Sequence, residues 1–222
     1  MKIIVLNHKM NLLYEELDNY LSEIDKLKYN LIIAPSNIYL LEFLKKTHHQ
    51  IASQDICYLE YGNYTGKVSW SQIKALGIKY SLIGHSEKND NIDKINAKLL
   101  SCLSNNITPI LCFGNRTKEE SATTSLDKIN YFDERIIYAY EPIFNISTNE
   151  IDIKYLEDKI NQIHNYLLEK GIKKPTILYG GGINEKNITN IYHFDNLSGI
   201  ILGAISSDID KLKKILMKLD EK

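Results

Sequence analysis

The feature that most constrains the fold of this chain is a regular alternation between short apolar segments and longer segments with helical periodicity. The apolar segments hold four to six residues, are rich in isoleucine, leucine and tyrosine, and end at glycine, proline or polar residues. Segments of this kind are typical of the buried strands of a parallel sheet. They recur along the sequence at residues 2–6, 31–34, 51–54, 80–83, 108–113, 136–140, 176–179 and 199–202.

The segments between these runs carry leucine and isoleucine at spacings of three and four residues, with charged residues between them. This pattern predicts helices at residues 12–28, 38–46, 69–76, 92–103, 150–169 and 209–219, the third with Ser69 as its N-cap. Residues 115–134 are polar and weakly patterned, and we expect one short helix there. The alternation favours a closed (β/α)8 barrel over an open doubly wound sheet, as a single α/β domain over residues 1–222.

Size and composition limit the classes of function. At 222 residues and 44% hydrophobic content, the chain can bury one sizeable core. A net charge of −1 favours neither nucleic acid nor an anionic membrane surface as a partner. No apolar run approaches the roughly 18 residues of a membrane span, and the first residues lack the pattern of a signal peptide. The three cysteines are widely spaced, so we expect reduced thiols, a cytoplasmic protein and no metal site.

Several polar residues stand directly after predicted strands, and in a parallel barrel these carboxyl ends meet at the face that carries the chemistry. Glu141 precedes Pro142, which cannot continue an ordinary ladder, and it would act as a general base if partial burial raised its pKa. His85 would donate a hydrogen bond to a carbonyl oxygen, and Lys9, close to Asn7, would face an anionic substrate. Taken singly, each has an ordinary alternative: a solvated carboxylate, a structural histidine and a surface lysine.

Two glycine-containing turns follow the seventh and eighth predicted strands, at residues 180–182 and at Gly203-Ala204. By default such residues form ordinary turns. In a barrel, however, the loops after these two strands also form a recurrent phosphate site, where backbone N–H groups meet the anion. The sequence therefore predicts a site for a phosphorylated ligand on the same face as Glu141.

Six collinear motifs resemble those of the triosephosphate isomerase family, and together they span nearly the whole chain. They read N-H-K-M-N at residues 7–11, G-N-Y-T-G at 62–66, L-I-G-H-S-E at 82–87, L-C-F-G at 111–114, A-Y-E-P-I-F at 139–144 and I-L-Y-G-G at 177–181. As a set they are highly specific. The resemblance implies a TIM barrel that interconverts dihydroxyacetone phosphate and glyceraldehyde 3-phosphate in glycolysis and gluconeogenesis, without a metal or organic cofactor.

The resemblance also implies roles for particular residues. Glu141 would move a proton between adjacent carbons through an enediol(ate). His85, as a neutral imidazole, would polarise the carbonyl group and handle the oxygen-bound protons of the intermediate. Lys9 would stabilise negative charge, with Asn7 lining the same pocket. The residues that bind the substrate and its phosphate group would be Asn7, Lys9, Ser147, Gly181, Gly182, Gly203 and Ala204. The lid that closes over the intermediate and excludes water would be formed by Pro142, Ile143, Phe144, Asn145, Ile146, Ser147 and Thr148.

Residues 62–66 resemble a loop that, in this family, inserts into a pocket beside the active site of the partner subunit. The ordinary interpretation is a surface turn, because glycine, asparagine and threonine are common in turns. Against it, Tyr61 and Tyr64 would place two aromatic rings on an exposed loop, and such rings are enriched where partners bury them. We therefore expect a twofold symmetric homodimer in which Thr65 reaches toward the partner's Lys9.

The sequence departs from the family pattern at positions of the phosphate site and the lid. Ser147 and Ala204 stand where the family has glycine, and Gly182 stands where it has serine. Asn115 replaces an acidic residue, and the connection at residues 115–134 is shorter than in the family. One alternative is thus a catalytically weakened barrel that binds a phosphorylated ligand or a protein partner. Another sugar-phosphate isomerase or epimerase is disfavoured, because the predicted rim has no metal cluster.

Overall fold

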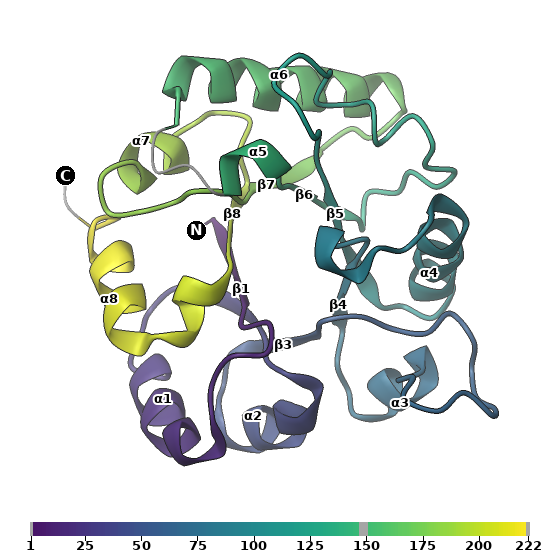
Figure 1. The fold of residues 1–222 in the computed structure, drawn as a ribbon, viewed down its shortest axis with the longest axis vertical. Helices are drawn as coiled ribbons and strands as arrows, with labels where there is room; N and C mark the ends of the chain where they lie inside the picture. The colour runs from purple at the N-terminus through teal and green to yellow at the C-terminus, as the bar shows by residue number, and fades with distance from the viewer. Residues whose placement is uncertain (1, 147–150, 221–222) are drawn as a thin grey trace.

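The computed structural model describes residues 2–146 and 151–220, and its parallel strands form a closed barrel in chain order (Figure 1). The last strand pairs with the first, with Ile3 opposite Gly199, which closes the ring. The predicted (β/α)8 barrel is confirmed. The strands are β1 (Ile3–Asn7), β2 (Asn30–Ala34), β3 (Gln50–Ser53), β4 (Tyr80–Ile83), β5 (Thr108–Phe113), β6 (Ile137–Tyr140), β7 (Thr176–Tyr179) and β8 (Gly199–Leu202).

Helices surround the ring of strands on the outside, as Figure 1 shows. The α-helices are α1 (Leu17–Ile24), α2 (Leu40–Lys46), α3 (Trp70–Ala75), α4 (Ile92–Ser104), α5 (Ile143–Ile146), α6 (Ile153–Glu169), α7 (Ile188–Tyr192) and α8 (Ile209–Met217). Short 3-10 turns are η1 (Tyr14–Glu16), η2 (Asn37–Tyr39), η3 (Ser86–Lys88) and η4 (Ala204–Ser207). None of the helices in the described part of the chain is long and apolar enough to cross a membrane.

The predicted strands agree with the observed ones to within one residue at each end. The predicted N-cap is also confirmed. The Ser69 side chain accepts a hydrogen bond from the backbone N–H of Gln72, and the Gln72 side chain accepts one from the backbone N–H of Ser69. This reciprocal pair satisfies two donors that the first turn of a helix leaves free.

The helix predicted within residues 115–134 is wrong, because this connection forms only turns. One i to i+4 hydrogen bond, from Asp127 N–H to the Thr123 carbonyl, is made there. The segment is rich in serine and threonine, whose side chains compete for backbone groups and disfavour helix. It is held instead by burial of Ala122, Leu126 and Ile129. Helix α7, in contrast, was not predicted, since its apolar positions are too few to show a period.

Two apolar layers lie on the two sides of the barrel wall, because successive residues of a strand point in opposite directions. The inner layer consists of Val5, Ile32, Ala34, Ala52, Leu82, Ile110, Cys112, Ile137, Ala139, Leu178 and Ile201. The outer layer packs against the helices and takes the larger residues of β6 and β7, Tyr138, Tyr140 and Tyr179. Burial on both sides explains why the strands read as nearly continuous apolar runs.

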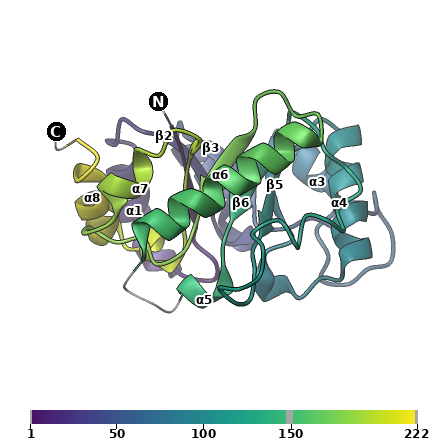
Figure 2. The same ribbon diagram turned by 90° about the horizontal axis from the view of Figure 1, so that it is seen from above.

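The carboxyl ends of the strands all open on one face of the barrel. Figure 2 shows α5, which follows β6, at one edge of the molecule and the N-terminus, which precedes β1, at the opposite edge. The connections that leave the strands therefore gather at one end, and the side chains predicted to be functional belong to these connections.

Candidate active site

Glu141 is the first residue after β6, and its backbone N–H donates to the Phe113 carbonyl over 2.7 Å. Glycines at the ends of β5 and β7 flank it closely. A Cβ atom at Gly114 would lie 2.2 Å from the Glu141 carbonyl oxygen, and one at Gly180 would lie 2.9 Å from its Cγ atom. Distances this short exclude any larger side chain without a shift, so both neighbouring strand ends are shaped around this residue.

The Glu141 carboxylate is largely shielded from water, with 16% of the side chain exposed. Within the described part of the chain, its Oε1 atom is buried and accepts no hydrogen bond. Its Oε2 atom lies 3.8 Å from His85 Nε2. Burial, followed by the charge of Glu141, raises the pKa of Cys112 well above that of an ordinary thiol, so a neutral thiol borders the carboxylate. Among the described residues, the carboxylate thus lies beside a neutral thiol, and its Oε1 atom has no hydrogen-bond partner.

His85 is buried and follows Gly84, whose φ of 77° makes the turn out of β4. Its Nδ1 atom accepts a hydrogen bond from the backbone N–H of Glu87 over 3.3 Å. An amide N–H only donates, so Nδ1 carries a lone pair, and the proton of the neutral ring is on Nε2. The Nε2–H group is therefore the one that faces Glu141.

Lys9 and Asn7 extend from β1 into the same region. The Lys9 ammonium lies 2.6 Å from a Glu87 carboxylate oxygen, and the backbone N–H of Lys9 donates to the Asn7 side chain over 3.2 Å. The side-chain amide of Gln54 donates to the Lys9 carbonyl over 2.7 Å. Partial burial alone would raise the pKa of Glu87, but the hydrogen bond and charge of Lys9 outweigh it and lower the pKa.

Glu87 and Gln54 were given no role from the sequence, yet they hold two of the predicted residues in place. Glu87 supplies the N–H that fixes the His85 tautomer and the carboxylate that pairs with Lys9. A signal was present, because Glu87 closes the same motif that contains His85. No such signal marks Gln54, which follows β3 and reaches Lys9 across the end of β2, where it also donates to the Ala34 carbonyl.

The predicted phosphate loops lie at the ends of β7 and β8. Gly181 and Gly182 have φ angles of 140° and 56°, so glycine suits both positions and a serine at Gly182 would be strained. Gly203 lies against Lys9, because a Cβ atom placed on it would be 3.5 Å from Lys9 Cε. Ala204 is exposed and is not among the residues with positive φ, so the alanine fits its backbone without strain.

The described part of the predicted lid consists of Pro142 and helix α5, whereas Ser147 and Thr148 lie outside the described residues. Asn115 holds the start of the lid in place. The sequence had marked this residue only as a departure from the family. The Asn115 carbonyl accepts a hydrogen bond from Ile143 N–H over 3.1 Å, and its side chain accepts one from the Tyr140 hydroxyl over 2.6 Å. The first turn of the lid is thereby tied to β5 and β6.

Two cavities open among these residues. Asn7, Lys9 and His85 line one of about 230 Å³, and Glu141 lines another of about 590 Å³ together with residues of the 115–134 connection. His85 of the first cavity and Glu141 of the second face each other, with 3.8 Å between Nε2 and Oε2, so the two cavities adjoin at this pair. The four predicted catalytic residues thus meet at the carboxyl end of the barrel.

The predicted dimer loop projects outward beside α3 (Figure 1). Within it, the backbone N–H of Tyr64 donates to the Gly62 carbonyl, and the Tyr64 ring covers Gly62, whose φ is 139°. Thr65 is exposed at the tip of this turn. Tyr61 is 82% exposed and Tyr64 is half exposed, so both aromatic side chains are available for further contacts.

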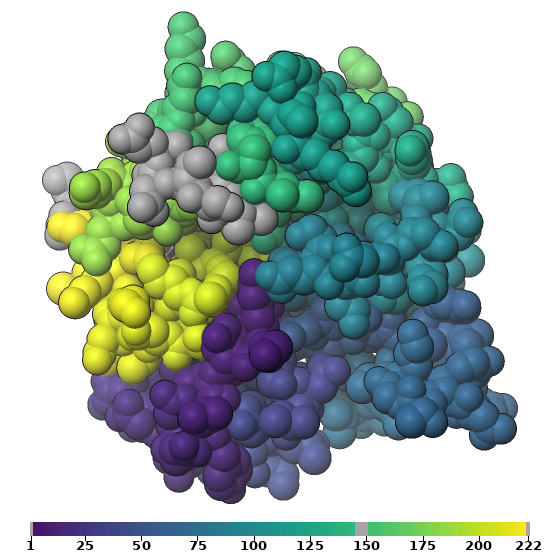
Figure 3. All heavy atoms as spheres, viewed as in Figure 1, coloured from purple at the N-terminus to yellow at the C-terminus, as the bar shows by residue number. Residues whose placement is uncertain are grey.

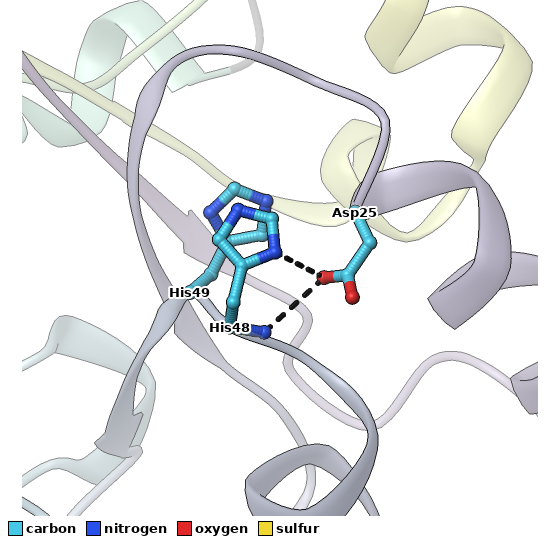
Figure 4. A group of neighbouring side chains, drawn as sticks. All are labelled: Asp25, His48 and His49. Carbon is cyan, nitrogen blue, oxygen red and sulfur yellow. Dashed lines mark hydrogen bonds and ion pairs between the residues drawn. The ribbon is translucent and has the colours of Figure 1, made fainter.

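A group of side chains that could hold a metal ion lies at the opposite end of the barrel. Asp25, His48 and His49, shown in Figure 4, follow α1 and precede β3, and their ligand atoms lie within 4.8 Å of one another. Asp25 accepts from the backbone N–H of His48, and the His49 ring donates to the Ile24 carbonyl over 3.0 Å. These bonds cap the end of α1, and the group is remote from the candidate active site.

Comparisons with known proteins cover almost the entire chain. The family model described as triosephosphate isomerase matches residues 2–219. This chain is similar to two proteins named triosephosphate isomerase. The one from Malacoplasma penetrans is 28% identical over 97% of each chain, and the one from Orientia tsutsugamushi strain Ikeda is 32% identical over 96% of each chain. A third, from Buchnera aphidicola subsp. Baizongia pistaciae, is 31% identical over 97% of this chain and 98% of its own. The chain belongs to the triosephosphate isomerase family.

Proposed function

We propose that the protein interconverts dihydroxyacetone phosphate and glyceraldehyde 3-phosphate, a step of glycolysis and gluconeogenesis. The observation that carries this proposal is the pair of His85 Nε2 and Glu141 Oε2, which face each other over 3.8 Å. Aldose–ketose isomerisation needs a base at the carbon that loses its proton and a hydrogen-bond donor at the adjacent carbonyl oxygen. A carboxylate and an imidazole N–H, so close together, supply both functions in one small region.

In this mechanism the Glu141 carboxylate removes a proton from one carbon. This proton exchanges with solvent while Glu141 holds it, and Glu141 then delivers a proton to the neighbouring carbon. The His85 Nε2–H group donates to the oxygen on which negative charge develops, and this bond strengthens as the enediol(ate) forms. His85 also gives its Nε2 proton to this oxygen and takes the hydroxyl proton from the other oxygen, so that the hydroxyl and carbonyl groups exchange places. The lone pair on Nδ1 is occupied by the Glu87 N–H, so His85 acts as a neutral imidazole rather than as an imidazolium ion. Both groups work from the ends of rigid strands, which limits their displacement.

Lys9 supplies a positive charge beside this pair. In the protein without substrate it is neutralised by Glu87, so an anionic substrate competes with the Glu87 carboxylate for the ammonium group. The substrate phosphate is bound by backbone N–H groups of the loops after β7 and β8 and by Ser147. Their glycines allow the close approach of backbone to anion. Asn7, buried at the end of β1, contributes to the same pocket.

The lid, Pro142 to Thr148, closes over the intermediate and excludes water. Exclusion is necessary because an exposed enediolate phosphate can eliminate its phosphate group. The hydrogen bond between Ile143 N–H and the Asn115 carbonyl fixes the first residues of the lid. The Asn115 side-chain amide also donates to the carbonyls of Thr117 and Glu120, and a carboxylate at this position could not make these two bonds.

We also propose that the protein is a cytoplasmic homodimer. Apolar side chains in the connections after β1, β2 and β3 are unusually exposed: Met10 by 93%, Ile38 by 77% and Tyr61 by 82%. Large exposed apolar groups on adjacent connections favour burial by a partner. The three cysteines are free and buried, which suits a reducing compartment.

A coupled assay with glyceraldehyde 3-phosphate tests the function. We expect turnover of both triose phosphates by the purified protein without added metal. The alternative of a weakened barrel predicts that the same preparation binds a phosphorylated transition-state mimic but turns over neither substrate. Binding without turnover would therefore reject the proposed activity and leave the fold and the site geometry unaffected.

A further inference from the structure

His8 lies between Asn7 and Lys9 in the sequence, but its side chain points to the other side of the barrel wall. It is fully buried between α1 and α2, with its ring edge-on to Tyr20 at 4.9 Å and to Phe43 at 5.5 Å between centroids. Burial of a polar imidazole ring among aromatic side chains costs free energy, so packing alone does not explain a histidine at this position.

The hydrogen bonds of His8 run toward the last loop of the barrel. His8 Nε2 lies 2.8 Å from the Tyr20 hydroxyl, and that hydroxyl lies 2.8 Å from the Ser206 carbonyl oxygen. A carbonyl only accepts, so the single Tyr20 proton points to Ser206 and the His8 Nε2–H group donates to Tyr20. The order of donors is thereby fixed from β1 through α1 to η4.

This order is maintained over the working pH range. Burial lowers the pKa of His8 to about 3 and raises the pKa of Tyr20, so neither group changes its charge near neutral pH. Within the described residues His8 Nδ1 is buried without a hydrogen-bond partner. The hydrogen-bond network therefore contains a buried nitrogen without a partner. Such a departure from good core packing is more typical of functional sites than of purely structural cores.

Both ends of the network adjoin groups that meet the substrate in the proposed function. At one end, His8 is followed directly by Lys9. At the other, the backbone N–H of Ser206 donates to the Gly203 carbonyl over 2.8 Å, closing the turn that contains Gly203 and Ala204. Figure 3 shows the purple residues of the loop after β1 beside the yellow residues that follow β8 on this face.

We propose that Tyr20 is a positioning residue, which sets the distance between the Lys9 ammonium and the backbone N–H groups of Gly203 and Ala204. This inference rests on the proposed function and extends it, because Tyr20 touches no substrate. Its hydroxyl holds η4 against β1, so the two parts of the phosphate site keep a fixed separation. The fixed separation would favour binding of the phosphate group of a triose phosphate and would not affect binding of its carbon chain.

The test is the variant Tyr20→Phe, which keeps the ring and removes the hydroxyl. We expect KM for glyceraldehyde 3-phosphate to rise about tenfold, which corresponds to 1.4 kcal/mol, with kcat changed less than about twofold. Competitive inhibition by inorganic phosphate should weaken by a similar factor. Turnover of unphosphorylated glyceraldehyde should not change, because that substrate makes no use of the phosphate loops.

A matched control is Tyr29→Phe. The Tyr29 hydroxyl also lies against groups far along the chain, 2.9 Å from the Leu216 carbonyl oxygen in α8 and 2.5 Å from the Asp220 carboxylate, but these are at the carboxyl-terminal end of the chain. If Tyr20 served stability alone, both variants would melt earlier and both would keep the wild-type KM and phosphate inhibition. That result would overturn the proposal.

A second pair of variants decides the question if Tyr20→Phe does not fold. His8→Gln keeps an N–H donor near the position of Nε2, and His8→Leu removes it. We expect His8→Gln to retain phosphate affinity and His8→Leu to lose it. Equal affinities of the two variants would contradict the positioning role of Tyr20. Inorganic phosphate binding is measured by calorimetry as well. If the wild type has no isomerase activity, weaker phosphate binding by Tyr20→Phe still supports the inference, and unchanged or absent binding rejects it.

Discussion

Lys9 adopts a backbone conformation that lysine ordinarily avoids. Its φ is 54°, in the left-handed region, which costs a residue with a side chain about 1–2 kcal/mol. The N–H of Lys9 donates to Asn7, and its carbonyl accepts from Gln54, so both backbone polar groups are held in this conformation. Strain of this kind persists where the surroundings fix it and is concentrated at functional sites. Here it turns the Lys9 side chain back over the strand ends.

The buried His8 makes a prediction about stability and pH. Its pKa is about 6.5 in the unfolded chain and about 3 in the folded protein, where burial disfavours the charged ring. A depressed folded-state pKa contributes stability that is fully present above pH 6.5 and is lost as the pH falls toward 3. The free energy of unfolding should therefore decline on acidification, with a slope approaching about 1.4 kcal/mol per pH unit from this group.

Urea unfolding between pH 7 and pH 5 at one protein concentration checks this prediction. The His8→Leu variant should show a shallower decline of the unfolding free energy than the wild type. Replacing the exposed His193 by leucine is the control, and we expect its slope to follow the wild type. Parallel slopes for wild type and His8→Leu would show that His8 is not buried in its neutral form.

At the residue scale, the sequence pointed to the groups that we propose to carry the chemistry but not to those that position them. Asn7, Lys9, His85 and Glu141 stand out because polar residues directly after apolar strands are rare and informative. Tyr20 does not stand out, because a tyrosine on the apolar face of a helix is indistinguishable in sequence from an ordinary core residue. Its contact with Ser206 joins residues 186 positions apart, and no local pattern reports such a contact.

At the element scale, strands were predicted more accurately than the connections. The strands are buried on both sides of the barrel wall, so nearly every residue is apolar and the signal is strong. The 115–134 connection buries only a few apolar side chains, and its serines and threonines are equally compatible with turns. Its actual path depends on tertiary contacts, such as the hydrogen bond from Asn130 N–H to the Asn96 side chain.

The packing of strand ends around Glu141 gives a prediction at this scale. In Gly180→Ala the new Cβ atom would lie 2.5 Å from Ile201 Cγ2 and 2.9 Å from Glu141 Cγ, so these side chains must move. We expect a loss of about 1–3 kcal/mol in stability, as for other overpacked sites. Isomerase activity per folded molecule should also fall, because the displaced side chain is the proposed base.

The control for this prediction is Gly199→Ala at the amino end of β8. A Cβ atom there would lie 1.9 Å from the Ile3 carbonyl oxygen, so this variant is also overpacked, but at the end of the barrel away from Glu141. Stability is measured by urea unfolding and activity at a temperature where each variant is folded. Equal specific activities for the two variants would mean that Gly180 does not position Glu141.

At the scale of the whole molecule, the proposed dimer depends on the loop that projects beside α3. We predict that Tyr64→Asp gives a monomer with much lower activity, because a charge on a half-exposed aromatic position prevents its burial by a partner. Sedimentation at micromolar concentration measures the assembly. Met217→Asp is the control, since Met217 is also exposed but belongs to α8. A wild-type monomer with full activity would refute the role of the loop.

The most direct test of the central claim, that Glu141 moves a proton from carbon, is hydrogen exchange followed by NMR in D2O. With dihydroxyacetone phosphate as substrate, we predict that the wild type and a control variant, Glu157→Gln on the exposed side of α6, incorporate deuterium at carbon. Glu141→Gln keeps the shape of the side chain, and its exchange should be slower by about 10²–10⁴-fold or more. Exchange by Glu141→Gln at the wild-type rate, or conversion by the wild type without deuterium in the product, would contradict the account.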